Sequence, residues 1–196
     1  MKRQSEFKRT TKETNIEVRL LLDGTGICNI DTSIPFMDHM LTLMGAHGLF
    51  DMDIRAKGDI EVDFHHTVED LGICIGRCID ECLGDRKGIV RFADATICMD
   101  EALARVVIDI SNRPFMVFRG LKEGLRTGGF DLFLLREFFK ALTNSAGITL
   151  HIEVLYGEDP HHISEAIFKA FGIALDRAVA EERRLKGKVP SSKGVI

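Results

Sequence analysis

The sequence contains the pattern His-His-x-x-Glu twice, as HHTVE from His65 and as HHISE from His161. The two copies lie 96 positions apart and hold four of the seven histidines of the chain. At the start of a helix, positions i, i+3 and i+4 share one face, whereas positions i and i+1 diverge by about 100°. Each glutamate can therefore join one of its two histidines at a metal ion, and the other histidine must point elsewhere.

A further potential ligand precedes each pair, in a segment with helical periodicity. The segments DHMLTLMGAHGLFDMDI and REFFKALTNSAGITLHI align without gaps at an offset of 98, which places His39 on Glu137. Imidazole and carboxylate donors without thiolates suit manganese, iron, nickel, cobalt or zinc, and chemistry alone does not choose among them. The sequence predicts two metal sites of about four protein ligands each, drawn from His39, His65, His66, Glu69, Glu137, His161, His162 and Glu165.

The elements that must position these residues also repeat. The segments LGICIGRCIDECLGD and IFKAFGIALDRAVAEE follow the two motifs, align at an offset of 96 and have the periodicity of long amphipathic helices. Two strands are expected before the first helix of each half, NIEVRLLLD with ICNID and ALARVVIDI with FMVFR, each pair as a hairpin. In the first pair DGTG is expected to be the hairpin turn.

These elements predict an α+β fold made of a duplicated β-β-α-β-α half, with sheets packed on one side by helices. The first repeat half is expected to span residues 1–90 and the second residues 91–186, followed by a C-terminal tail at 187–196. The two halves are expected to form one compact catalytic unit.

The composition is that of a globular protein of 196 residues, with 45% hydrophobic and 29% charged residues. A net charge of −4 gives no bulk basic field, so neither nucleic acid nor an anionic membrane is indicated as a partner. The basic cluster KRQSEFKR is expected to be a solvated terminus. Because no apolar run approaches membrane-spanning length and the start lacks an apolar signal region, a cytoplasmic location is expected.

The cysteines indicate packing and not a bridged or zinc-bound framework. Five cysteines without a Cys-x-x-Cys spacing argue against both disulfides and a zinc ribbon. Cys74, Cys78 and Cys82 recur at every fourth position and predict a single buried stripe along a helix.

Several stretches together resemble the imidazoleglycerol-phosphate dehydratase family of histidine biosynthesis. They are ET at 13–14, LDGTG at 22–26, DHML at 38–41, HGLF at 47–50, HHTVED, SNRPF at 111–115, AGITLHI at 146–152, HHISEA with KAF, and SSKG at 191–194. The resemblance covers nearly the whole chain. It implies the single-function form, a ribosomal protein S5 domain 2-like fold, a homo-oligomeric cage of 24 subunits, and two Mn²⁺ ions per active site shared between subunits.

The implied reaction dehydrates D-erythro-imidazole glycerol phosphate to imidazole acetol phosphate, which is the work of a carbon-oxygen lyase (a hydro-lyase). The carbon-bound proton that must be lost is not acidic, because no carbonyl group lies next to it. A metal ion on each ring nitrogen would stabilise the ring as an imidazolate, which could expel the hydroxyl through a diazafulvene-like intermediate. A duplicated half supplies the two equivalent metal sites that this chemistry needs.

The resemblance also assigns residues to the substrate. Glu13 matches the family position implied in acid-base catalysis, and arginine forks with a lysine suit a phosphate dianion. The implied substrate contacts are Glu13, His47, Arg91, Arg113, Ser191, Ser192 and Lys193. Some relatives have a histidine where this chain has Glu137, but other members carry glutamate there, so Glu137 is kept as a ligand. The tail LKGKVPSSKGVI is expected to be mobile from its composition and to close on the phosphate.

Two other classes of function explain part of the pattern. A dinuclear metallohydrolase would use the same ligands to attack a phosphoester or an amide, but it would not need two equivalent halves. A metal-binding cage without catalysis would require neither Glu13 nor the tail. An assay for ketone formation from imidazole glycerol phosphate, with free phosphate measured alongside, discriminates among the three.

Overall fold

The computed structural model describes residues 2–196, whose elements follow one another in two similar series. The first series is β1 (Gln4–Thr10), β2 (Thr14–Leu21), β3 (Cys28–Asp31), α1 (Pro35–Gly48), β4 (Asp51–Gly58) and α2 (His65–Leu83). The second is β5 (Phe92–Met99), β6 (Ala102–Asp109), β7 (Phe115–Arg119), α3 (Phe133–Ala146), β10 (Thr149–Tyr156) and α4 (Pro160–Val179). The short strands β8 (Arg126–Thr127) and β9 (Phe130–Asp131) precede α3, and the 3-10 helix η1 (Arg183–Leu185) follows α4.

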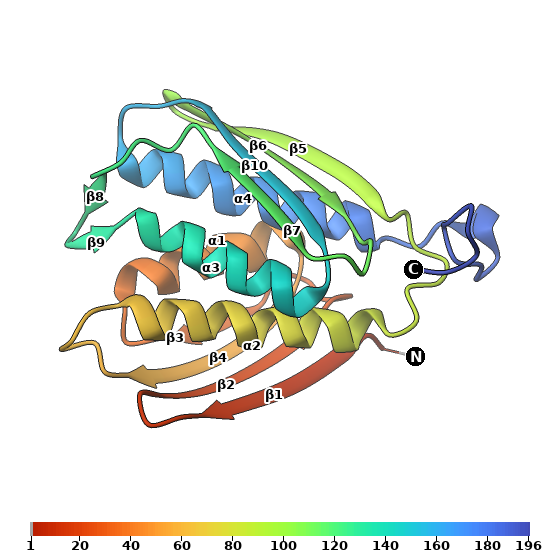
Figure 1. Cartoon of the computed structure of the whole chain (residues 1–196), viewed down its shortest axis with the longest axis horizontal. Helices are drawn as coiled ribbons and strands as arrows, with labels where there is room; N and C mark the ends of the chain where they lie inside the picture. Colours follow the sequence, from red (N-terminus) through yellow and green to blue (C-terminus); the bar gives the residue numbers. More distant parts are fainter. Residues whose placement is uncertain (1) are drawn as a thin grey trace.

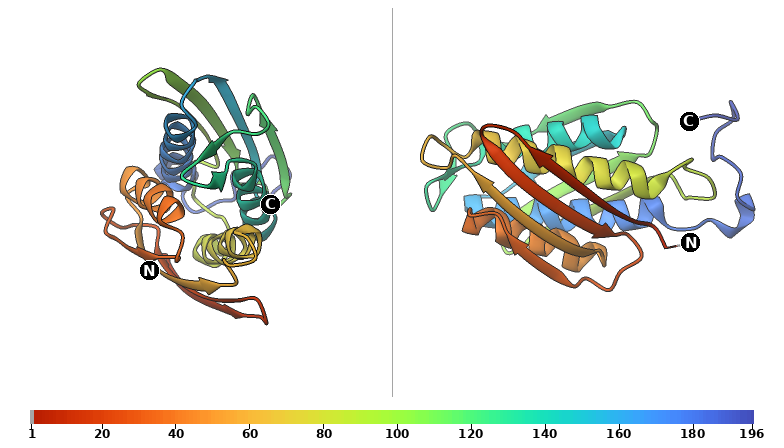
Figure 2. Two further views of the ribbon diagram at one scale, coloured as in Figure 1. Left: turned by 90° about the vertical axis from the view of Figure 1, so that its left-hand side faces the viewer. Right: turned by 90° about the horizontal axis from the view of Figure 1, so that it is seen from below.

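Two four-stranded sheets form the outer layers and the four long helices lie between them (Figures 1 and 2). The strand orders are β1-β2-β4-β3 and β5-β6-β10-β7, which match element by element. Helices α1 and α2 pack on the first sheet and α3 and α4 on the second, while α1 contacts α4 and α2 contacts α3 across the middle. The predicted α+β class, with a repeated half and helices on one side of each sheet, is confirmed.

Each series has one strand more than predicted. The N-terminal cluster, expected to be a solvated terminus, keeps Lys2 and Lys8 exposed but forms the edge strand β1, and β5 is the equivalent edge strand of the second sheet. In β1 the side chains alternate between exposed and half-buried, with Phe7 packed against the core. A strand that covers little of the core carries mostly polar side chains, so its alternation is weak in the sequence.

The two predicted hairpins are also wrong. Strand β3 pairs in parallel with β4, and β7 pairs in parallel with β10, so neither is the partner of the strand that precedes it. Strand β2 instead lies between β1 and β4, antiparallel to both. Residues 22–27 therefore connect two strands that do not pair, and DGTG is not a hairpin turn. A loop of this length can close a hairpin or leave the sheet, and the sequence does not distinguish the two.

Glycines allow the two helix pairs to approach closely. A Cβ atom at Gly76 of α2 would lie 2.6 Å from the carbonyl oxygen of Leu142 in α3. At Gly172 of α4 it would lie 2.4 Å from the carbonyl oxygen of Met44 in α1. The two contacts are equivalent, because Gly172 follows Gly76 by 96 positions and Leu142 follows Met44 by 98, the offsets that align the sequence halves. The α1–α4 and α2–α3 pairs therefore pack through equivalent backbone contacts.

The apolar faces of the helices are used inside the protein. Cys74, Cys78 and Cys82 are buried along one face of α2, as predicted. Among residues 2–196, no helix combines the length and the apolar character needed to cross a membrane.

Candidate active site

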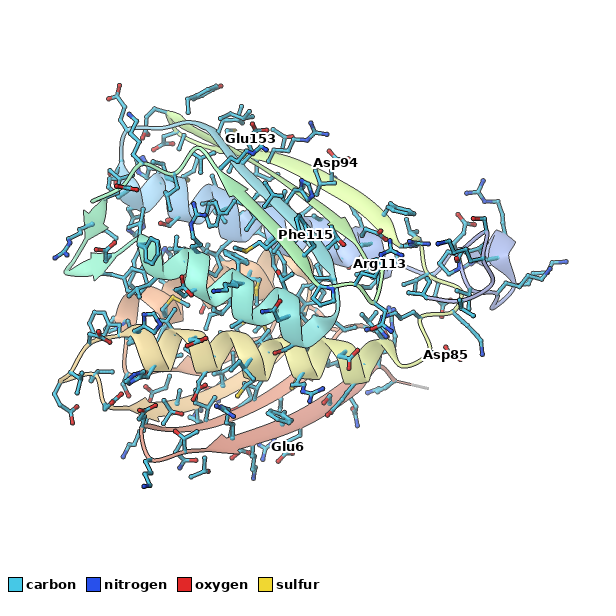
Figure 3. The ribbon with its side chains drawn as sticks, viewed as in Figure 1. Glu6, Asp85, Asp94, Arg113, Phe115 and Glu153 are labelled. Atoms are coloured by element: carbon cyan, nitrogen blue, oxygen red, sulfur yellow. The ribbon has the colours of Figure 1, made fainter. Side chains whose placement is uncertain are left out.

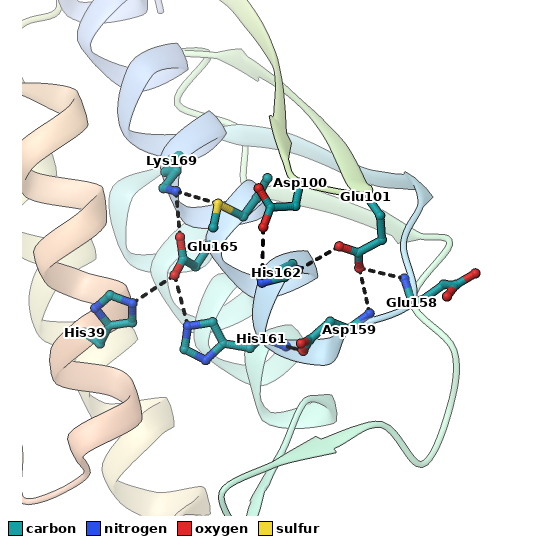
Figure 4. A network of polar contacts seen from close by, with 10 residues as sticks. His39, Asp100, Glu101, Glu158, Asp159, His161, His162, Glu165 and Lys169 are labelled. Atoms are coloured by element: carbon teal, nitrogen blue, oxygen red, sulfur yellow. Dashed lines mark hydrogen bonds and ion pairs between the residues drawn. The ribbon is translucent and has the colours of Figure 1, made fainter.

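Three of the expected metal ligands converge from two helices of different halves. The Nε2 atoms of His39 in α1 and His161 in α4 each lie 3.0 Å from Oε1 of Glu165 (Figure 4). One donor atom from each residue lies within 4.8 Å of the others. Both helices start at a proline, Pro35 or Pro160, a residue pre-shaped for the first helical turn. The expected ligands therefore lie in the first two turns of two packed helices.

The charge on Glu165 suits a cation. Burial alone raises the pKa of this carboxyl, but hydrogen bonds, chiefly from Lys169, outweigh that effect and lower the pKa to about 2. Nζ of Lys169 lies 2.6 Å from Oε2 of Glu165, so Oε1 is the oxygen turned to the imidazoles. An ionised carboxylate between two imidazole nitrogens is a donor set that divalent transition metals accept. The cluster thus fits a metal ion.

In the other helix pair, α2 and α3, the equivalent residues are less closely clustered. Nε2 of His65 lies 3.7 Å from Oε2 of Glu69, both in α2. Glu137 lies on α3, where its carboxylate is 3.7 Å from Nζ of Lys140. Among residues 2–196, the first cluster is the one group of three donors that lie within 4.8 Å of one another. In this pair the structure therefore brings His65 and Glu69 together, and Glu137 does not complete a cluster of the same compactness.

The second histidine of each motif points away from its neighbour and meets a carboxylate. The ring centroids in the two motifs are 6.2 and 6.3 Å apart, with interplanar angles of 78° and 84°. Nδ1 of His66 lies 3.1 Å from Asp59 and 3.9 Å from Oε2 of Glu13. Nδ1 of His162 lies 2.7 Å from Oε2 of Glu101. These hydrogen bonds raise the pKa of both histidines.

Three residues of these networks were missed by the sequence reasoning. Lys169 follows Glu165 by four positions, so the i,i+4 spacing on a helix could have identified it. Asp59 and Glu101 approach their histidines from loops at the ends of β4 and β5. No local pattern marks such loop carboxylates, because only the fold brings them beside the motifs.

Two of the expected phosphate contacts meet at one carboxylate. Nε of Arg91 lies 2.7 Å from Oδ1 of Asp109, and Nη2 of Arg113 lies 3.8 Å from Oδ2 of the same residue. Nη1 of Arg91 donates to the carbonyl oxygen of Pro190 at 2.7 Å, which ties down the start of the tail. The Arg91 backbone N–H donates to the carbonyl oxygen of Ala178, near the end of α4.

This arginine pair lies at the opposite end of the molecule from the expected metal ligands. Ala178 follows His161 by 17 residues, a helical rise of roughly 26 Å. Arg113 and the C-terminus lie on the right of the view, where the long helices α2 and α4 end (Figures 1 and 3). Ser191 is half-buried in the tail, and Ser192 and Lys193 are exposed. One chain alone therefore does not bring the expected phosphate and metal contacts together.

The last expected contact, His47, is exposed in the last turn of α1. It lies eight residues after His39 in the same helix, a rise of about 12 Å. Within one chain it therefore lies outside the cluster around Glu165.

Comparisons of the sequence and of the structure with known proteins identify the same family. The model of the imidazoleglycerol-phosphate dehydratase family matches residues 32–175. Over 196 residues, covering 100% of both chains, the sequence is 52% identical to the imidazoleglycerol-phosphate dehydratase of Trichlorobacter lovleyi and 50% identical to that of Geobacter sulfurreducens. The crystal structure of the Staphylococcus aureus dehydratase superposes with a TM-score of 0.82 at 39% identity, covering 91% of this chain and 99% of that one. The structure from Pyrococcus furiosus gives 0.83 at 38%, covering 97% and 100%.

Proposed function

The chain belongs to the imidazoleglycerol-phosphate dehydratase family, and we propose that it carries out its dehydration at a site with two Mn²⁺ ions that is shared between subunits. It is a hydro-lyase of histidine biosynthesis that converts D-erythro-imidazole glycerol phosphate to imidazole acetol phosphate, within a metal-dependent family. The observation that carries the two-metal proposal is the convergence of His39, His161 and Glu165 on one point, in a helix pair that the repeat duplicates.

The proposed metal ligands come from both helix pairs. They are His39, His65, His66, Glu69, Glu137, His161, His162 and Glu165. When bound, the ions supply Lewis acidity at the two nitrogens of the substrate's imidazole ring. The carboxylate of Glu137, in place of an imidazole, lowers the net charge of its site. The chain's own contribution is to hold the imidazole and carboxylate donors in fixed directions at the helix starts.

Glu13 is the proposed acid-base residue. It lies in the turn between β1 and β2, its side chain is 54% exposed, and its Oε2 lies 3.9 Å from a ring nitrogen of His66. An exposed carboxylate beside a proposed ligand would accept a carbon-bound proton at Oε2 and later return it.

The distance between the proposed phosphate and metal contacts supports sharing between subunits. A three-carbon chain separates the ring from the phosphate of the substrate, and it cannot span the roughly 26 Å along α4 that separate the two groups in one chain. Arg91 and Arg113, with Ser191, Ser192 and Lys193 of the tail, would then bind the phosphate of a substrate whose ring lies at a neighbour's ligands. His47 would contact the substrate from α1.

We further propose a cage of 24 subunits located in the cytoplasm. Subunit sharing requires a homo-oligomer, and the relatives are biosynthetic enzymes. In this proposal the halves 1–90 and 91–186 act as one unit, because each helix pair takes one helix from each half. Residues 187–196 serve as a tail that closes on the phosphate and excludes water.

The test is an assay of the purified protein after metal removal and after addition of Mn²⁺. We expect ketone to form from imidazole glycerol phosphate only with the metal present, and free phosphate to stay at background. Release of phosphate without ketone would favour a dinuclear hydrolase instead.

A further inference from the structure

Glu13 and Glu101 occupy the same position in the two halves. The antiparallel β1–β2 and β5–β6 pairs have the same register at an offset of 88. At that offset Glu13 falls on Glu101, each in the turn that joins the two strands. His66 and His162, which are equivalent at an offset of 96, are the histidines that these two glutamates approach. The duplication has therefore placed one turn glutamate beside the second histidine of each motif.

The two glutamates are held very differently. Oε1 of Glu101 accepts hydrogen bonds from the backbone N–H groups of Glu158 and Asp159, at 3.1 and 2.8 Å. Its Oε2 lies 2.7 Å from Nδ1 of His162, so both oxygens are engaged (Figure 4). Among residues 2–196, the Glu13 carboxylate has no hydrogen bond, and its ion pair with His66 is 3.9 Å long. One carboxylate is held by three hydrogen bonds and the other, within the part of the chain that the structure describes, by none.

The difference between the two glutamates arises from the loop that joins the last strand of each half, β4 or β10, to the helix that begins with the motif, α2 or α4. Gly58 and Gly157 are equivalent, because a Cβ atom at either would meet the equivalent residue of the following helix and of the neighbouring strand. Six residues, 59–64, separate Gly58 from the first motif, whereas three residues, 158–160, separate Gly157 from the second. The shorter loop turns its backbone N–H groups onto the turn glutamate. The longer loop instead brings the Asp59 carboxylate to His66.

We propose that Glu101 and Asp59 are positioning residues that accept the Nδ1 proton of His162 and His66, leaving Nε2 of each ring to bind a metal ion. A carboxylate on the second ring nitrogen is how proteins commonly orient a ligating histidine and select its tautomer. Because Asp59 takes this task in the first half, Glu13 is released from it and can transfer protons. Nε2 of His162 makes no short contact to the nearby Asp100, whose Oδ2 lies 3.8 Å away. The inference rests on the proposed function, since it presupposes these ligands.

Glu101→Gln is the most informative substitution. The amide oxygen can keep both bonds from the backbone N–H groups, which directs the amide NH₂ toward Nδ1 of His162. The ring must then accept at Nδ1 and carry its proton on Nε2, which blocks the proposed metal-binding atom without removing the histidine. We expect the affinity of one of the two Mn²⁺ sites per chain to fall about 10–100-fold. The measurement is an equilibrium titration of the full-length protein in which free Mn²⁺ is counted by electron paramagnetic resonance.

Three further variants separate positioning from catalysis. Asp59→Asn should weaken the other Mn²⁺ site to a similar degree, and Glu101→Asp, which keeps a carboxylate acceptor, should recover part of the lost affinity. Glu13→Gln, the same change at the equivalent position, should keep both affinities and lose turnover. Excess Mn²⁺ should restore much of the turnover of Glu101→Gln and none of that of Glu13→Gln.

The outcomes distinguish this inference from the function on which it rests. Unchanged Mn²⁺ affinity in Glu101→Gln, with a melting curve like that of the unsubstituted protein, would overturn it. Weakened Mn²⁺ binding in Glu13→Gln would do the same, because the two glutamates would then share one role. If Glu101→Gln melts at a lower temperature, the Mn²⁺ affinities of Asp59→Asn and Glu101→Asp decide whether the carboxylates position the histidines. Failure of the unsubstituted protein to bind Mn²⁺ would instead overturn the proposed function.

Discussion

Oε1 of Glu165 lies 3.0 Å from Nε2 of His39, although the two residues are 126 positions apart in the chain. The contact joins α4 of the second half to α1 of the first, and His161 adds a second imidazole at the same distance. A metal bound here would tie the two halves together. Metal binding and the packing of the α1–α4 pair should therefore depend on each other.

Removal of metal should abolish activity, and Mn²⁺ should restore it. We expect about two divalent ions per chain, and His39→Ala or His161→Ala should lower both metal content and turnover because each removes a proposed ligand. Elemental analysis and the dehydratase assay are the measurements. His151→Ala, at an exposed position of β10 outside the cluster, is the control and should change neither. Full turnover in protein stripped of metal would contradict the mechanism.

Metal removal should also loosen the assembly, because a ligand stabilises the state that binds it. Sedimentation velocity with and without chelator measures this effect. A particle of the same size and stability in both conditions would show that assembly does not depend on the metal.

Glu13→Gln should lower turnover while metal content and substrate binding are largely kept. The amide preserves size and hydrogen bonding but cannot take a proton, and general acid-base groups contribute about 10²–10⁴ in rate. Steady-state kinetics on the variant check this, with the exposed Glu123→Gln as the matched control. Near-normal turnover would mean that another group, such as His47, accepts the proton.

Deletion of residues 190–196 should weaken substrate binding and leave the metals and the assembly intact. Lys193→Ala should reproduce part of the loss, on the order of 1.5–3 kcal/mol for a charge-assisted contact. Kinetics and substrate titration measure both variants. Lys188→Ala, five residues closer to the end of α4 than Lys193, removes a tail lysine outside SSKG and is the control. Unchanged binding in the truncated protein would leave the phosphate to Arg91 and Arg113 alone.

Gly172→Ala should destabilise the protein, although alanine favours a helix by about 1 kcal/mol over glycine. The added methyl would lie 2.4 Å from the carbonyl oxygen of Met44, so α1 and α4 must move apart. Overpacking of this kind costs about 1–3 kcal/mol, and Gly76→Ala should behave alike. Thermal unfolding measures the effect, with the exposed Arg77→Ala as the control. A raised melting temperature would show that α1 and α4 can move apart without loss of stability.

The buried cysteines should not react with thiol reagents in the folded protein. Burial raises the pKa of Cys74 to about 12, of Cys78 to about 11 and of Cys82 to about 12, so at pH 8 almost no thiolate is present. The exposed Cys98 should react first. Counting alkylated thiols by mass spectrometry before and after unfolding tests this, and five should react in denaturant. Rapid labelling of the three in native protein would contradict the burial.

The sequence by itself determined the class of the fold and supplied the candidate residues of the site. The repeat is visible in the residue types, so HHTVE, HHISE and the offsets of 96 and 98 identify equivalent candidate ligands without coordinates. Helical geometry alone requires the two histidines of each motif to diverge, and the structure has them diverge. The α+β class and the buried stripe of Cys74, Cys78 and Cys82 followed from periodicity, which depends only on neighbours along one element.

The tertiary structure decided which equivalent residues meet. His39 faces His161 and not His65, because α1 packs on α4 of the other half through backbone contacts more than 100 residues apart in sequence. The parallel pairing of β3 with β4 and the polar edge strand β1 likewise depend on partners that no local pattern names. The different surroundings of Glu13 and Glu101 arise from three extra residues in one loop. Loop length is visible in the sequence, but the direction in which a loop turns its N–H groups and carboxylates depends on the elements packed around it.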